Sequence, residues 1–167
     1  MRRVMAVLAG VLPAVFGCAQ HRSSDDGPQG NDMAVAVPSD AEPIRAAARQ
    51  ARESLDGFIE RLSASAPGQS DFSIKVAVHD GEATHYLWLQ AVSYEDPHFR
   101  GSLGPDAAGI NGHAPGERVE VDRSEVEDWM YVQGGKLVGG FSLRAIRDRL
   151  AGKAREQFER SMWFAFE

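Results

Sequence analysis

The feature that most limits the fold is an apolar stretch close to the N-terminus. Residues 4–17 carry no charge and are mostly hydrophobic, and they follow the basic pair Arg2 and Arg3. A helix of this length would span roughly 21 Å, which is too short for about 30 Å of hydrocarbon. A short apolar segment behind a positive N-terminus is instead typical of a cleaved signal peptide. We therefore predict that residues 1–17 are removed and take no part in the folded domain.

The only cysteine of the chain, Cys18, follows this stretch directly. The sequence Val15-Phe16-Gly17-Cys18 resembles a bacterial lipobox, in which a lipidated cysteine becomes the mature N-terminus. The resemblance implies diacylglycerol on the Cys18 sulfur, a stable anchor when two or more acyl chains are present. By resemblance to lipoprotein sorting in diderm bacteria, Ala19 in place of an Asp favours the outer membrane over retention at the inner one. The alternatives are an ordinary secretory signal and a buried segment with an incidental cysteine.

Residues 18–38 are rich in Ser, Asp, Gly and Pro and show no sustained period. This composition predicts a flexible tether between the lipid and a single domain over residues 39–167. A strand at residues 33–37 is the alternative. The net charge of -6 argues against a nucleic-acid partner, because phosphate binding requires a basic surface. We expect contact with membrane lipid through the anchor and a protein partner in the cell envelope, on its periplasmic side.

The first element of the domain is predicted to be one helix of about five turns. Ser39 and Glu42 have the spacing of a capping box, and Pro43 suits a first helical turn. Apolar side chains then recur at helical spacing as far as Leu62, while arginines lie mostly on the opposite face. The sequence Ala66-Pro67-Gly68 ends the helix.

The middle of the chain predicts strands. Residues 72–78 alternate apolar and polar side chains, Asp80-Gly81 favours a tight turn, and residues 84–94 form the return strand. Because both faces of the return strand are largely apolar, we expect it to be central and covered on both sides. Residues 95–116 are rich in Gly and Pro, which predicts a long loop, and such loops often carry function.

The last third predicts a further strand, a hairpin and a second helix. The strand holds Val119 and Val121, the hairpin of residues 125–138 turns at Gly134-Gly135, and the helix covers residues 142–158. Residues 162–166 are expected to dock as a terminal strand. Together these elements predict an α+β domain with an antiparallel sheet of about five to six strands and an N-terminal and a C-terminal helix packed on one of its faces.

Several short motifs in this region resemble the YegJ-like bacterial family of unknown function (domain of unknown function 2314). They occur in the expected order over residues 71–147: Ile74-Lys75-Val76, Leu87-Trp88-Leu89, Phe99-Arg100-Gly101-Ser102-Leu103 with Pro105, Gly116-Glu117-Arg118-Val119, Asp128-Trp129-Met130-Tyr131, Gly135-Lys136, Gly139-Gly140-Phe141 and Leu143-Arg144. His85 and Gly104 depart from the pattern, which has an acidic residue and an Asn there. The resemblance implies a compact domain with no agreed activity.

The candidate ligand-binding residues are Asp128, Trp129, Arg144 and His85. A carboxylate, an indole donor and a guanidinium can form one face of a ligand site, with Arg144 pairing either Asp128 or an anionic ligand. The alternative is structural: Asp128 caps a turn, Trp129 is core, and Arg144 forms an ion pair. Large aromatic side chains are most often core, which favours this alternative.

The histidines offer weak support for metal or acid–base chemistry. None belongs to a His-Glu-x-x-His motif, and only His85, His98 and His113 are placed to converge on zinc, which needs about three protein ligands. No phosphate-binding loop or nucleophile elbow is present in the sequence, so we predict neither a metal nor a cofactor.

Three functional hypotheses remain. The first is a lipid-anchored envelope protein whose domain binds a partner or ligand without catalysis. The second is an envelope enzyme that uses His85, Asp128 or His113 as acid–base groups in a cleft of the long loop. The third is a structural or inhibitory lipoprotein.

Overall fold

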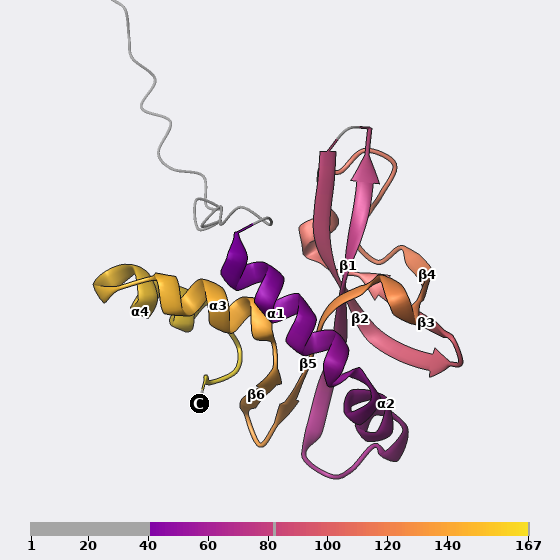
Figure 1. Cartoon of the computed structure of the whole chain (residues 1–167), viewed down its shortest axis with the longest axis horizontal. Coiled ribbons are helices and arrows are strands. Elements are labelled where there is room, and N and C mark those ends of the chain that lie inside the picture. The colour runs from indigo at the N-terminus through magenta and orange to yellow at the C-terminus, as the bar shows by residue number, and fades with distance from the viewer. Residues whose placement is uncertain (1–40, 82, 167) are drawn as a thin grey trace, which may run out of the picture. The chain divides into compact units, whose positions relative to one another are not determined.

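The computed structural model describes residues 41–81 and 83–166, which form an α+β domain with a six-stranded antiparallel sheet (Figure 1). The predicted fold class is therefore confirmed. The signal peptide, Cys18, the tether and the capping Ser39 lie outside the described residues.

The sheet is built mostly from neighbouring hairpins. Its strands run in the order β4-β3-β2-β1-β5-β6, and every pair is antiparallel. The strands are β1 (Gln69–Asp80), β2 (Ala83–Glu95), β3 (His98–Leu103), β4 (Arg118–Asp122), β5 (Val126–Gln133) and β6 (Lys136–Gly139). The predicted hairpins at Asp80-Gly81 and Gly134-Gly135 are both present. Only the β1–β5 pairing joins strands distant in sequence, so it places β5 beside β1 at the centre of the domain.

Two apolar clusters lie on the two faces of the sheet. Along β5, Trp129 and Tyr131 belong to the larger cluster, whereas Met130 and Val132 belong to the smaller one. Because successive strand residues point to opposite faces, the clusters occupy opposite sides. Helices α1 (Glu42–Glu53) and α2 (Leu55–Ala64) contribute to the larger cluster, and the C-terminal segment contributes to the smaller. Helix α3 (Phe141–Arg149) contributes to both clusters, because Phe141 packs against the larger one and Leu143 against the smaller one.

Strand β2 is interior, as predicted, but it is not covered on both faces. Leu87 and Leu89 are buried in the larger cluster. On the other face Tyr86 is 36% exposed and Trp88 is only half-buried. The aromatic side chains on this face therefore remain accessible, which matters for the cavity described below.

The predicted N-terminal helix is two helices that meet at Ser54. The hydroxyl of Ser54 donates to the carbonyl of Gln50 at 2.6 Å and lies 3.3 Å from that of Ala51. A serine that bonds the preceding turn in this way competes with the helical pattern. The break redirects the chain so that Phe58 of α2 is buried in the core.

The predicted C-terminal helix is also divided. Helix α3 (Phe141–Arg149) is followed by the extended residues Leu150 and Ala151, and α4 (Gly152–Ser161) begins at a glycine with φ of 52°. The apolar residues keep helical spacing across this break, so the sequence pattern predicted one helix. Gly152 was the residue in the pattern that indicated a break, because glycine readily adopts a left-handed backbone. Residues 162–166 dock on β6 through one bridge, between Lys136 and Ala165, rather than as a strand.

The predicted long loop begins later than residue 95, because β3 occupies residues 98–103. The sequence analysis assigned this strand to the loop because Gly101 lies in its middle, and glycine is unfavourable within strands. Its absence of a side chain is required there: a Cβ would lie 2.9 Å from a methyl carbon of Val92 and 3.0 Å from the carbonyl oxygen of Gln90. The glycine allows β3 to pack closely against β2.

Gly139 allows α3 to start directly against Trp129. Its φ is 72°, and a Cβ there would collide with the carbonyl oxygen and the indole ring of Trp129. A side chain would thus meet both backbone strain and steric overlap.

We predict that Gly139→Ala lowers the free energy of unfolding by about 3 kcal/mol, because a left-handed backbone and overpacking are both unfavourable for alanine. Gly134→Ala is the matched control. Its φ is 57° and its Cβ would meet nothing within 4 Å, so only the backbone strain of about 1 kcal/mol applies. Urea unfolding measures both; equal losses would contradict the steric role of Gly139.

Candidate functional site

Asp128 connects the sheet to the start of α3. Its side chain is fully buried, and its carboxylate accepts three backbone N–H groups, from Trp129 at 2.8 Å, Phe141 at 3.2 Å and Ser142 at 2.7 Å. The first N–H groups of a helix have no partner within the helix, and an acidic side chain is well suited to bind them. Asp128 is therefore a helix cap within the core.

Trp129 and Arg144 also make contacts within the fold. The Trp129 indole N–H donates to the carbonyl of Ala51 at 2.9 Å, and its ring stacks on Phe58. The Arg144 guanidinium donates to the carbonyls of Gly139 at 2.8 Å and Leu137 at 2.7 Å, so the proposed pairing with Asp128 is not formed. These contacts match the structural alternative for Asp128 and Trp129, while Arg144 holds backbone carbonyls instead of an ion pair.

His85 lies apart from the other three candidates. It is half-buried on β2 opposite Val78, on the face of β2 that carries Leu87. The structure thus brings Asp128, Trp129 and α3 together but leaves His85 outside the group. A shared ligand-binding role for the four residues stays a prediction.

The remaining histidines lie on separate elements. His98 is in β3 opposite Asp122, and the ring of His113 is 3.3 Å from the carboxylate of Glu117 in the loop before β4. Within residues 41–81 and 83–166, no group of three or more His, Cys, Asp or Glu side chains is arranged to hold a metal ion.

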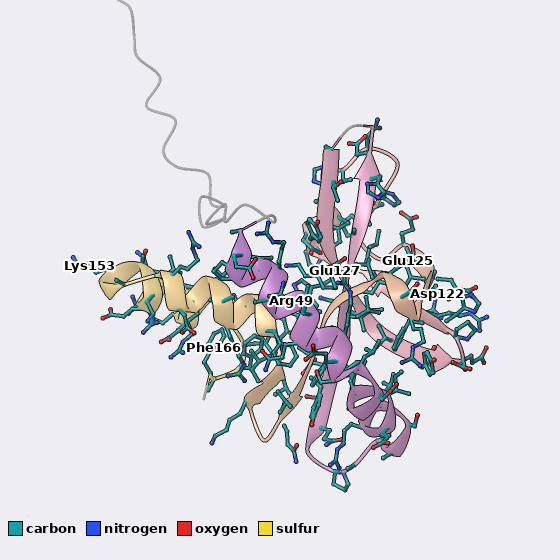
Figure 2. The ribbon with its side chains drawn as sticks, viewed as in Figure 1. Arg49, Asp122, Glu125, Glu127, Lys153 and Phe166 are labelled. Atoms are coloured by element: carbon teal, nitrogen blue, oxygen red, sulfur yellow. The ribbon has the colours of Figure 1, made fainter. Side chains whose placement is uncertain are left out.

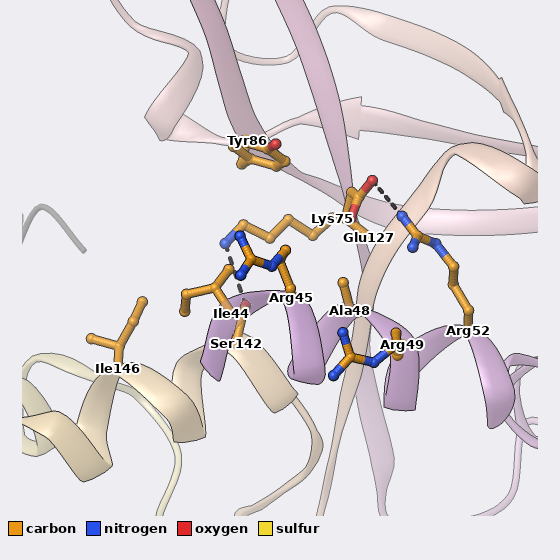
Figure 3. A pocket seen from close by; sticks show the side chains of 10 residues that line it. All are labelled: Ile44, Arg45, Ala48, Arg49, Arg52, Lys75, Tyr86, Glu127, Ser142 and Ile146. Atoms are coloured by element: carbon orange, nitrogen blue, oxygen red, sulfur yellow. Dashed lines mark hydrogen bonds and ion pairs between the residues drawn. The ribbon is translucent and has the colours of Figure 1, made fainter. Parts of the chain in front are cut away.

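A cavity of about 400 Å³ lies between α1, the start of α3 and the β1–β2 hairpin (Figure 3). Its polar lining comes from Arg45, Arg49, Arg52, Lys75, Tyr86, Glu127 and Ser142, and its apolar lining from Ile44, Ala48 and Ile146. Arg49 and Glu127, on α1 and β5, are labelled in the view of the whole chain (Figure 2). Among these described lining residues, four basic groups face one carboxylate, so the cavity is cationic in a chain whose net charge is -6.

The arginines of the cavity are held by carboxylates at its rim. The carboxylate oxygens of Glu42 form ion pairs with the guanidinium nitrogens of Arg45 at 3.0 Å and Arg49 at 2.8 Å. All three side chains are more than half exposed. Arg52 pairs with Glu127 at 2.6 Å and also donates to the carbonyl of Val126. Exposed ion pairs of this kind contribute little to stability, so an incoming anion can replace or share them at low cost.

Lys75 has a different environment. Its ammonium donates to the Ser142 hydroxyl at 3.3 Å and lies 6.0 Å and 5.7 Å from the ring centroids of Tyr86 and Trp88. Within the described part of the chain, no carboxylate lies close enough to form an ion pair with it, although Asp128 is its register partner on β5. A half-buried cation thus has one long hydrogen bond and two aromatic faces.

Burial controls the protonation of this region. It lowers the pKa of Lys75 below its ordinary value, and the charges of Asp128, Asp106 and Glu127 oppose this effect without cancelling it. Burial likewise raises the pKa of Asp128, against the hydrogen bonds from Ser142 and Trp129 and the charge of Lys75. Water exclusion therefore outweighs the attraction between the two groups.

The comparison with protein families agrees with the sequence motifs. The family described as "Uncharacterized protein conserved in bacteria (DUF2314)" matches residues 41–166. The chain belongs to this family. The match is wider than the motif region of residues 71–147, and it includes the helices α1 and α3 that line the cavity.

Two relatives are similar to this DUF2314 chain. "Uncharacterized protein YegJ" of Escherichia coli (strain K12) is 26% identical over 113 residues, which cover 68% of this chain and 72% of the relative. "Putative ankyrin repeat protein" of Neisseria meningitidis serogroup B is 25% identical over 138 residues, which cover 78% of this chain. The match spans about half of that second relative, 54% of its length. No solved structure matches the chain.

None of the helices in the described part of the chain is both long enough and apolar enough to cross a bilayer.

The DUF2314 cavity was not predicted from the sequence, but signals for it were present. Arg45, Arg49 and Arg52 are spaced four and three residues apart, which places them on one side of a helix. Lys75 interrupts an apolar strand and stands opposite Trp88. What the sequence could not supply is the arrangement that brings α1 and α3 beside that lysine.

We predict that wild-type protein becomes more stable relative to Lys75→Met as the pH rises from neutral to about pH 10. The unfolded chain retains the proton on Lys75 up to its ordinary pKa of 10.5, whereas the folded protein releases it at lower pH. Between these values the unfolded state binds more protons, so rising pH removes a penalty that is fully present below the folded pKa. Urea unfolding across this range measures the difference; a fall in relative stability would show that the pKa is raised instead.

Proposed function

We propose that this DUF2314 protein is a lipid-anchored envelope protein whose domain binds a small organic anion in the Lys75 cavity. The observation that carries the binding proposal is a cavity with four basic groups and one carboxylate, into which a lysine without an ion pair projects. Cationic hollows with apolar walls attract and retain anions more strongly than flat surfaces do.

The lining indicates which part of a ligand would contact which wall of the cavity. Arginine forks suit carboxylate or phosphate groups, and each arginine of α1 that lines the cavity pairs with a carboxylate at the rim. Ile44, Ala48 and Ile146 provide apolar surface for a carbon skeleton. A cavity of about 400 Å³ fits a small molecule rather than a protein segment.

The proposal concerns binding. The acid–base candidates of the enzyme hypothesis, His85, His113 and Asp128, do not line this cavity. Asp128 already accepts three backbone N–H groups, which leaves it little capacity to exchange protons with a ligand. A protein partner in the envelope stays a prediction, and Trp163, 62% exposed, is the side chain of the described domain most suited to such a contact.

We predict that inorganic phosphate and glycolate stabilise the wild-type protein against heat in a saturable manner, and that Lys75→Met loses most of this gain. A ligand at one hundred times its dissociation constant adds about 2.7 kcal/mol to the free energy of unfolding. Thermal unfolding at low ionic strength, with and without each anion, measures the gain in every variant. The gain, not the absolute stability, is compared, because removing a half-buried charge alters the stability itself.

Lys153→Met is the matched control. It also removes one lysine, but from an exposed position in the first turn of α4, away from the cavity (Figure 2). Equal gains in Lys75→Met and Lys153→Met would show that the anions act on net charge, which would contradict the cavity as the binding site.

The anchor rests on the sequence alone, because Cys18 lies outside the described residues. We predict that the mature protein begins at a lipidated Cys18 and that Cys18→Ser releases it from the membrane fraction, since the acyl chains provide the affinity for lipid. Intact-mass measurement of the membrane-extracted protein tests this. An unmodified Cys18, or a chain that retains residues 1–17, would contradict the proposal.

A further inference from the structure

Lys75 is the lysine of this chain placed to react with a bound molecule. The sequence holds three lysines, and Lys136 and Lys153 are exposed on β6 and α4. Lys75 instead projects from β1 into the cavity, with its nitrogen beside the Ser142 hydroxyl (Figure 3). The three side chains therefore offer an internal comparison of the same amine in different surroundings.

The contacts of Lys75 are compatible with a neutral amine as well as with an ammonium. A serine hydroxyl accepts a hydrogen bond from an ammonium and donates one to a neutral nitrogen. The absence of an ion pair with a described carboxylate leaves no fixed negative charge that would hold the proton at short range. Burial lowers the pKa of Lys75, which increases the fraction of free amine at neutral pH.

The surroundings of this amine define the molecules that would reach it. Arg45, Arg49 and Arg52 lie along the α1 wall and favour a ligand with a carboxylate or phosphate. A bound anion would place its carbon skeleton against the apolar wall, between the arginines and the lysine. A carbonyl carbon in that skeleton would meet the nitrogen of Lys75.

We propose that Lys75 binds a carbonyl-bearing organic anion, such as a keto acid or an aldehyde acid, covalently and reversibly as an imine. This inference rests on the proposed function, because the anion site positions the carbonyl group.

The step requires no oxidant or reductant. The neutral amine of Lys75 attacks the carbonyl carbon, the electron pair of the C=O bond moves to oxygen, and a proton passes from nitrogen to that oxygen through water. The nitrogen lone pair of the resulting carbinolamine then forms the C=N bond as the C–O bond breaks, and the remaining N–H proton passes through water to the departing hydroxyl group, so that one water molecule leaves and a neutral imine remains. Addition of water reverses each of these changes and releases the ligand.

The test uses glyoxylate as the probe and cyanoborohydride as the trap, with the purified full chain at neutral pH. Hydride reduces any imine to a stable secondary amine, and peptide mass spectrometry then measures the label on each lysine. We expect Lys75 to be labelled at least about tenfold faster than Lys136 or Lys153, because only Lys75 is desolvated and positioned beside an anion site. Equal or slower labelling of Lys75 would overturn the proposal.

Two controls determine which part of the inference holds. Acetaldehyde has the carbonyl group but no carboxylate, so the preference for Lys75 should disappear; an equal preference would overturn the assignment of an anionic ligand. Lys75→Arg keeps the positive charge and should eliminate the fast label while leaving the slow labelling of Lys136 and Lys153 unchanged. Persistence of a fast label in this variant would also overturn the proposal.

Glycolate separates this inference from the proposed function. It has the carboxylate of glyoxylate but no aldehyde, so it should bind without reacting and should slow the labelling of Lys75. If glycolate stabilises the protein through Lys75 and glyoxylate forms no imine there, the covalent step alone is wrong. If neither molecule acts at Lys75, the anion-binding function itself fails.

Discussion

The carboxylate of Asp128 holds the start of α3 against the central strand, and the geometry of the cavity depends on this contact. Its two oxygens accept N–H groups from β5 and from the first turn of the helix. The helix cannot approach so closely unless Gly139 and Gly140 precede it without side chains, because a Cβ at either position would overlap Trp129 or Leu137. The position of Ser142, and with it the hydrogen bond to Lys75, follows from this arrangement.

The same arrangement removes two groups of opposite charge, Asp128 and Lys75, from water and so disfavours the charged form of each. Asp128 and Lys75 are register partners on adjacent strands, yet they do not form a direct ion pair. Burial shifts both pKa values toward the neutral forms. Asp128 compensates for lost hydration with three N–H groups, whereas Lys75 has one hydroxyl and two aromatic rings. Lys75, whose lost hydration is the less well replaced of the two, is the one that lines the cavity.

The sequence predicted the elements better than it predicted their junctions. Alternation and turn residues located β1, β2, β5 and β6, since these signals act over a few neighbouring residues. Two helical stripes ran across Ser54 and Gly152, where a hydroxyl and a left-handed glycine divide the helices. Strand β3 was missed because Gly101, required for contact with β2, weakens the strand pattern.

The candidate site shows the same limit at the level of tertiary structure. Asp128, Trp129 and Arg144 were noticed because they are polar or aromatic residues in a dense motif, but their contacts are made within the fold. Lys75 and the arginines of α1 are separated by more than twenty residues in sequence. Only the packing of α1 and α3 beside the hairpin reveals that they share a cavity.

The position of Lys75 is better explained by binding than by stability. A half-buried ammonium without an ion pair loses hydration that nothing charged replaces, and an apolar side chain of similar length, such as methionine, would fill the space without that cost. Its aromatic neighbours and Ser142 recover part of the cost but provide no counter-charge. A ligand anion would supply this missing charge, and the arginines at the rim would hold it in the cavity. The unpaired charge of Lys75, which destabilises the protein without ligand, would thus contribute to its affinity for an anion.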